Sequence, residues 1–101
     1  MKNTYKLIWS DEALVSLKNI IAYLEDHWTK REIKKFARLL DKQLNLIEQN
    51  PFTFPKSDTS EEYRKSVLSK RTTIYYKIME YEVRIISIFD NRQNPEKINK
   101  P

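Results

Sequence analysis

The chain has 101 residues, a length that suits one compact domain with a single hydrophobic core. Nineteen Lys and Arg against fourteen Asp and Glu give a formal net charge of +5, which favours an anionic partner, either nucleic acid or an acidic protein. The lack of cysteine excludes disulfides, thiol catalysis and thiolate zinc sites, and the lack of glycine excludes the phosphate-cradling loops of nucleotide-dependent enzymes. We therefore expect no metal and no cofactor.

The first half of the sequence predicts one strand followed by two helices. Tyr5, Leu7 and Trp9 occupy every second position of residues 4–9, which predicts a short strand. Ser10 can cap a helix over residues 11–28, where apolar residues recur at helical spacing. Thr29 opens a Thr-x-x-Glu capping box, which predicts a second helix over residues 29–50 before a proline stops it. So short a break between helices favours an antiparallel hairpin.

Charged side chains on the outer faces of these two helices are interpreted as solvated residues. They are Lys18, Glu25, Lys34, Lys35, Arg38 and Lys42. No segment approaches the roughly 20 apolar residues that a membrane span needs, and the N-terminal residues lack the apolar stretch of a signal peptide. We therefore expect a cytoplasmic protein that does not bind membranes.

The second half predicts a loop followed by three strands and a tail. Residues 51–62 have the composition of a loop. Three segments rich in β-branched and aromatic residues follow, with short gaps that fit hairpin connections. These segments are residues 63–69, 72–79 and 83–89. Residues 91–101 are expected to form a polar, flexible tail.

The predicted fold class is α+β within a single domain spanning residues 1–101. An N-terminal strand and a three-stranded antiparallel meander should form one small, mainly antiparallel sheet. The antiparallel helical hairpin should cover one face of that sheet. A binding surface is then expected on the other face.

Cations and tyrosines are interleaved in the predicted strands of the second half. Between Tyr63 and Lys77 the chain carries no acid and five cations, namely Arg64, Lys65, Lys70, Arg71 and Lys77. Such a mixture can bind phosphates and stack bases. The alternative is that these residues merely keep one strand face soluble, as in many antiparallel sheets. The residues alone leave both interpretations open.

The order and spacing of several short segments resemble the RelE/ParE superfamily of toxins from type II toxin–antitoxin systems. The matching segments are Tyr5–Ser10, Ala13 with Leu17, Ile20 with Tyr23, Phe36–Leu40, Asn50–Phe52, Phe54–Pro55, Tyr63–Lys65, Ile74–Ile78 and Ile85–Pro95. The resemblance implies a small cytoplasmic bacterial toxin that a cognate antitoxin neutralises. RelE-like members cut messenger RNA on the ribosome, whereas ParE-like members poison DNA gyrase.

The residues that RelE-like enzymes use for cleavage are only partly matched. Arg64 falls on a basic position of these enzymes, but the arginine of the following strand corresponds to the uncharged Thr73. Residues 93–101 contain neither Tyr nor His for proton transfer, although Arg92 lies nearby. Because such a chain lacks an acid–base group, and because residues 91–95 look ParE-like, we expect a toxin that is not a catalyst.

Three hypotheses follow from the resemblance. The first is a ParE-like toxin that inhibits growth by binding a target, DNA gyrase, through Arg64, Lys65, Arg71, Tyr75, Lys77 and Arg92. The second is an mRNA endonuclease acting on the ribosome, with phosphate clamps formed by Arg64, Lys65, Arg71 and Arg92. The third is a degenerate, non-toxic domain that only binds an antitoxin. We expect neither Arg64 nor Arg71 to be a core residue, so charge reversal there should lower toxicity without unfolding the domain.

Overall fold

A computed structural model describes residues 5–58 and 60–90 of the chain. Its elements, in chain order, are β1 (Lys6–Trp9), α1 (Asp11–His27), α2 (Lys30–Gln49), the 3₁₀ helix η1 (Pro51–Thr53), β2 (Arg64–Val67), β3 (Thr72–Met79) and β4 (Glu82–Asp90). Each predicted helix and strand is present with its ends within three residues of the expected ones. The predicted α+β fold class is confirmed, whereas the tail expected at residues 91–101 lies outside the described residues.

Side-chain caps define where both long helices begin. The Ser10 hydroxyl accepts a hydrogen bond from the amide of Ala13 at 3.0 Å, and it donates to the carbonyl of Ile86 at 2.9 Å. The first cap therefore also ties α1 to β4. At α2 the predicted capping box is present, since Thr29 Oγ1 accepts from the amide of Glu32 and Glu32 Oε1 accepts from the amide of Thr29. These contacts confine the link between the helices to a few residues.

The four strands form one sheet in the order β1-β4-β3-β2. The pairs β2–β3 and β3–β4 are antiparallel, and β1 lies parallel to β4 because the two helices carry the chain between distant strands. β4 contains one extra residue opposite the step from Tyr75 to Tyr76, which is a β-bulge. The β3–β4 turn holds Glu80 at a φ of 40°, a conformation that glycine would adopt without strain.

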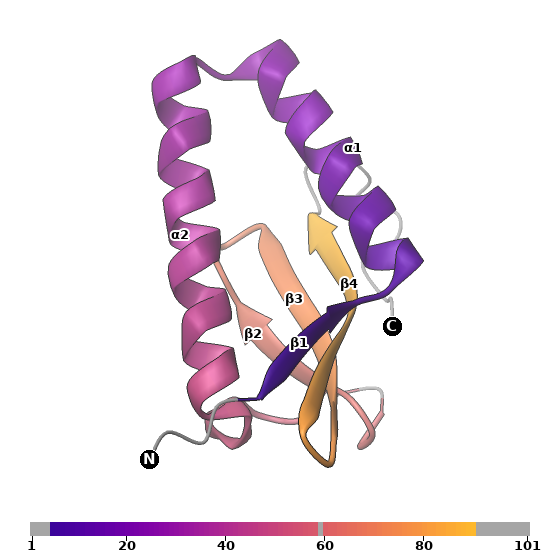
Figure 1. The fold of residues 1–101 in the computed structure, drawn as a ribbon. Coiled ribbons are helices and arrows are strands. Elements are labelled where there is room, and N and C mark those ends of the chain that lie inside the picture. The colour runs from indigo at the N-terminus through magenta and orange to yellow at the C-terminus, as the bar shows by residue number, and fades with distance from the viewer. Residues whose placement is uncertain (1–4, 59, 91–101) are drawn as a thin grey trace.

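Both helices pack on the same face of the sheet and diverge from the end where they are joined (Figure 1). The expected helical cover of one sheet face is thereby confirmed. Alternate strand residues and one side of each helix form the core, which contains Ala13, Ile20, Leu24, Phe36, Leu40, Ile47, Leu68, Ile74, Tyr76, Val83, Ile85 and Ile88. Gln43 Nε2 on α2 donates to the buried Ser66 Oγ on β2 at 2.6 Å, which fixes the far edge of the sheet under α2.

Candidate target-binding face

The sheet face turned away from the helices is called the open face here. It carries the side chains of Lys65, Val67, Tyr75, Lys77, Arg84 and Phe89. On β3 these positions alternate with the buried Thr72, Ile74 and Tyr76, so the assignment to one face follows from the two-residue period of a strand. Strand pairing brings the six residues into three neighbouring rows: Val67 with Phe89 across Thr73, Lys65 beside Tyr75, and Lys77 beside Arg84.

Three cations of the open face, Lys65, Lys77 and Arg84, have a carboxylate partner. Lys65 Nζ lies 2.9 Å from Asp58 Oδ2, and this hydrogen bond with the adjacent negative charge raises the pKa of Lys65 above its ordinary value. Lys77 Nζ lies 3.4 Å from Glu62 Oε1. Arg84 Nη2 lies 3.4 Å from the carboxylate of its strand neighbour Glu82. These exposed pairs contribute little to stability, but they leave the face with balanced charge.

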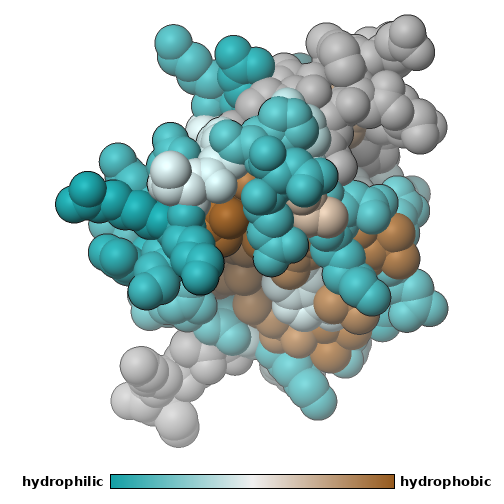
Figure 2. Space-filling model, turned by 90° about the horizontal axis from the view of Figure 1, so that it is seen from above, coloured by the Kyte–Doolittle hydropathy of each residue, from teal (hydrophilic) through white to brown (hydrophobic). Residues whose placement is uncertain are grey.

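Apolar and aromatic side chains lie among these ion pairs. Val67 keeps 59% of its surface exposed, and Tyr75 and Phe89 on the same face are half-buried. Figure 2 views the molecule from the end where the two helices are joined. From this side, exposed hydrophobic surface is seen as brown areas among hydrophilic side chains. A balanced, partly apolar face resembles a protein–protein interface more than a phosphate-binding surface, which would carry unpaired cations.

Arg64 does not share the open face with the other predicted binding residues. It pairs with Tyr76 on β3, so its side chain lies on the helix side of the sheet. The guanidinium donates from Nη1 to the carbonyl of Phe54 at 2.6 Å and lies 5.3 Å from the ring centre of Phe52. The expectation of an outward-facing Arg64 was therefore wrong, because the pairing register turns its side chain inward, where it holds the segment after η1 against β2.

Arg71 is exposed in the turn between β2 and β3, away from Arg64. Arg71 precedes Thr72 in the chain, whereas Arg64 pairs with Tyr76 across the sheet. Thr72 and Tyr76 are four residues apart on β3 and so separated by about 13 Å along the strand. The predicted phosphate-clamp residues therefore do not lie together. Arg64 is on the helix side of the sheet, Lys65 is on the open face, and Arg71 is in the turn. Arg92 lies outside the described residues.

The comparison with protein families identifies the chain. The family model described as the ParE toxin of the type II toxin–antitoxin system, parDE, matches residues 7–95. The chain belongs to this toxin family. It is therefore a toxin of a type II toxin–antitoxin system with a ParE/RelE-like fold, as the resemblance predicted. No curated protein sequence matches the chain significantly.

Solved toxin structures share the fold of this ParE-family toxin. The chromosomal ParDE toxin–antitoxin system from P. aeruginosa aligns with a TM-score of 0.74 at 14% identity, covering 88% of this chain and 98% of the other. The DinJ–YafQ toxin–antitoxin complex of E. coli gives 0.62 at 12% identity, covering 90% and 97%. The YoeB/ParE toxin from Agrobacterium tumefaciens gives 0.61 at 11% identity, covering 84% and 96%. At such identities the likeness concerns the fold.

Sequence reasoning missed part of the open face of the toxin. Arg84 was not singled out, although it lies between the buried Val83 and Ile85 and so had to point to the other side of the strand. Val67 and Phe89 were passed over because isolated apolar residues at strand ends look like core. The alternation of buried and exposed positions could have found Val67 and Arg84, whereas Phe89 reaches this face only because the β-bulge shifts the alternation along β4.

Residues 5–58 and 60–90 contain no group of three or more His, Cys, Asp and Glu side chains that could hold a metal ion. Among those residues, no helix has the length and apolar character needed to cross a membrane. His27, at the end of α1, stacks on the Tyr23 ring at 4.1 Å and contacts the Tyr23 carbonyl through Nδ1 at 2.8 Å. This histidine therefore has a local structural role at the helix end.

Proposed function

We propose that the chain is a ParE-like toxin that inhibits growth by binding a cellular protein, DNA gyrase, without catalysing a reaction, and that a cognate antitoxin neutralises it. The observation that carries this proposal is the match of the ParE family model to residues 7–95. The shared fold with a ParDE toxin–antitoxin system is consistent with it.

The open face supports a protein as the target. Lys65, Lys77 and Arg84 on this face are paired with carboxylates, and Tyr75 with Val67 and Phe89 offers aromatic and apolar contact area. Binding energy at protein interfaces is concentrated in such aromatic and arginine side chains, and Arg84 with Tyr75 supplies both. We therefore assign target binding to the open face, with Lys65, Tyr75 and Lys77 retained from the predicted residues and Arg84 added.

The arrangement of the predicted clamp residues disfavours the RNA endonuclease. Cleavage needs cations that converge on one phosphate and a group that transfers protons. Arg64 is engaged with Phe54 on the helix side, Lys65 is paired with Asp58, and Arg71 lies in the turn. Thr73, at the position where the resemblance expects an arginine, has no charge.

The surface of α2 supports an antitoxin with acidic and apolar residues. Leu39 and Leu46 are spaced by two helical turns and keep more than two fifths of their surface exposed. A groove of about 280 Å³ is lined by Trp28, Glu32, Lys35, Phe36, Leu39 and Ser69. An amphipathic segment could insert an apolar side chain into this groove while its carboxylates meet Lys35. Positive charge on the toxin would accelerate that encounter.

Assays with purified DNA gyrase test the target. We expect the toxin to inhibit supercoiling or to accumulate cleavage complexes at micromolar concentration. The matched control is the double variant Lys77→Glu/Arg84→Glu, which changes only exposed side chains of the open face and should be inactive. No effect of the parent toxin in either assay would refute the gyrase target. Codon-positioned cuts in messenger RNA, mapped by primer extension after induction, would establish the endonuclease instead.

A further inference from the structure

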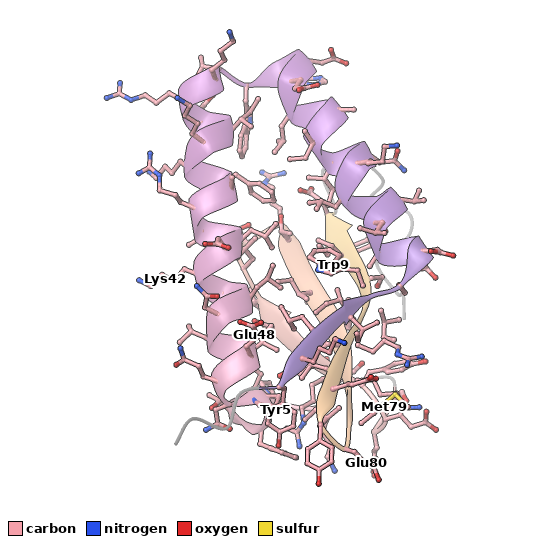
Figure 3. The ribbon with its side chains drawn as sticks, in the orientation of Figure 1. Tyr5, Trp9, Lys42, Glu48, Met79 and Glu80 are labelled. Atoms are coloured by element: carbon pink, nitrogen blue, oxygen red, sulfur yellow. The ribbon has the colours of Figure 1, made fainter. Side chains whose placement is uncertain are left out.

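The outer face of α2 carries six cations, which are called the α2 stripe here. They are Lys30, Arg31, Lys34, Lys35, Arg38 and Lys42, and all six are exposed. At 100° per residue they fall within an arc of about 140°, opposite the buried side of the helix that contains Phe36 and Leu40. Figure 3 shows the labelled Lys42 pointing away from the sheet and the rest of the molecule.

None of the six cations has an ion pair or side-chain hydrogen bond within residues 5–58 and 60–90. This distinguishes the α2 stripe from the open face, where Lys65, Lys77 and Arg84 each have a carboxylate partner. The two acids within residues 30–42 do not change this, because Glu32 is held in the capping box and Asp41 lies beyond ion-pair distance of any stripe residue. The stripe is therefore a positive surface without ion pairs, in which Asp41 is the one exposed acid of residues 30–42 within the arc.

Helix stability does not explain where these cations lie. Cations stabilise the C-terminal end of a helix, yet α2 has no basic residue in its last turn and places Lys30 and Arg31 in its first. Lys30, Lys34, Arg38 and Lys42 follow one another at four-residue intervals, so each lies beside a like charge, which destabilises a helix. α1, of similar length, has a single lysine and four acids. A need for solubility alone does not explain why the cations are concentrated on α2 while α1 carries mainly acids.

We propose that the α2 stripe binds the phosphate backbone of duplex DNA. The four-residue series rises about 6 Å per step and spans about 18 Å along the helix axis while turning through about 120°, so its cations can follow one edge of a duplex that carries a charge every 1.7 Å or so. Duplex is favoured over single strands because the stripe contains no aromatic side chain on which bases could stack.

DNA is favoured over RNA because of the shape of α2, and over an acidic protein because of the composition of the stripe. A protruding helix can approach the wide major groove of B-form DNA, whereas the major groove of A-form RNA is too narrow for it. Protein interfaces are depleted in lysine and need apolar anchors, while the stripe has four lysines and shares only Lys35, at its edge, with the surface proposed for the antitoxin. This inference goes beyond the proposed function and does not depend on gyrase as the target.

Fluorescence anisotropy with a labelled DNA duplex of about 20 base pairs tests the proposal on the full chain. We expect a micromolar dissociation constant at about 0.1 M salt, with log K falling linearly against log salt. The variant Lys34→Glu/Arg38→Glu should lose more than tenfold in affinity and reduce the salt slope by about 2. The control Lys56→Glu/Lys70→Glu changes the net charge equally at exposed positions elsewhere and should bind within about threefold of the parent.

The stripe variant should remain folded, because glutamates at positions 34 and 38 would face Lys30 and Lys42 at favourable four-residue spacing. Thermal melting and circular dichroism verify this directly. Equal losses in the stripe variant and the control would overturn the proposal, as they would reflect net charge alone. So would no binding of the parent at low salt, tighter binding of an RNA duplex of the same sequence, or more effective displacement by polyglutamate than by unlabelled DNA.

Discussion

The buried hydroxyl of Tyr76 connects two segments of the fold through one hydrogen bond. The Tyr76 side chain is fully buried, and its hydroxyl donates to the carbonyl of Pro51 at 2.7 Å. This bond joins the sheet to the segment that follows α2. Burial raises the pKa of Tyr76 above its ordinary value near 10, with the positive charge of Arg64 acting weakly in the opposite direction. The phenol therefore stays protonated in the folded state where the unfolded chain would ionise.

Replacing Tyr76 by Phe tests this description. Tyr76→Phe leaves the Pro51 carbonyl without its partner and should lower the free energy of unfolding by about 1–2 kcal/mol at neutral pH. Above pH about 10 only the unfolded state of the parent loses the proton, so the parent loses stability as pH rises. The difference between parent and variant should therefore shrink. Urea titrations from about pH 8 to about pH 11 measure this, and a constant difference would contradict it.

Arg64 illustrates the limit of sequence reasoning at the residue scale. Its position beside Lys65 in a basic strand predicted an outward, target-binding side chain, and strand alternation allows only one of two such neighbours to point outward. The sequence does not reveal which one, because both neighbours are long cations. The choice depends on the register with β3 and on the Phe54 carbonyl, both of which involve residues distant in sequence.

At the scale of elements, the β3–β4 hairpin is strained at one position. Glu80 adopts a φ of 40°, which costs an L-residue about 1–2 kcal/mol, and the chain contains no glycine to take that place. The residue is exposed at the turn, where its side chain is labelled in Figure 3. The turn is retained because the strand pairs on either side of it determine its geometry.

Glu80→Gly should raise the free energy of unfolding by about 0.5–1 kcal/mol, since the relief of strain exceeds the added flexibility of the unfolded chain. Glu80→Ala is the matched control. It keeps the Cβ atom responsible for the strain and should change stability by less than about 0.5 kcal/mol. Chemical denaturation of the three proteins makes the comparison. An unchanged or lower stability of the glycine variant would show that the turn is not strained.

The helices and strands themselves were predictable, because their signals are local. Ser10 and the Thr29–Glu32 box define the helix starts, Pro51 follows the end of α2, and alternating residues identify β3 and β4. The parallel pairing of β1 with β4 was not specified, since it joins segments at opposite ends of the chain. The same applies to the bulge in β4, which depends on pairing rather than on any residue type.

For the molecule as a whole, the arrangement of charge differs between the open face and the α2 stripe. The open face combines balanced ion pairs with aromatic and apolar side chains, whereas the α2 stripe holds unpaired cations. The net charge of +5 predicted an anionic partner but could not locate it. The two proposals together divide these roles, with the sheet recognising a protein target and α2 contacting phosphates.

Growth of cells that express open-face variants tests the central claim most directly. Lys77→Glu/Arg84→Glu should abolish growth arrest, while Lys56→Glu/Lys70→Glu, with the same change in net charge, should arrest growth like the parent. Both variants alter only exposed side chains, so their melting temperatures should stay within about 2 °C of the parent value. Full growth arrest by the folded open-face variant, expressed at the level of the parent, would contradict the account.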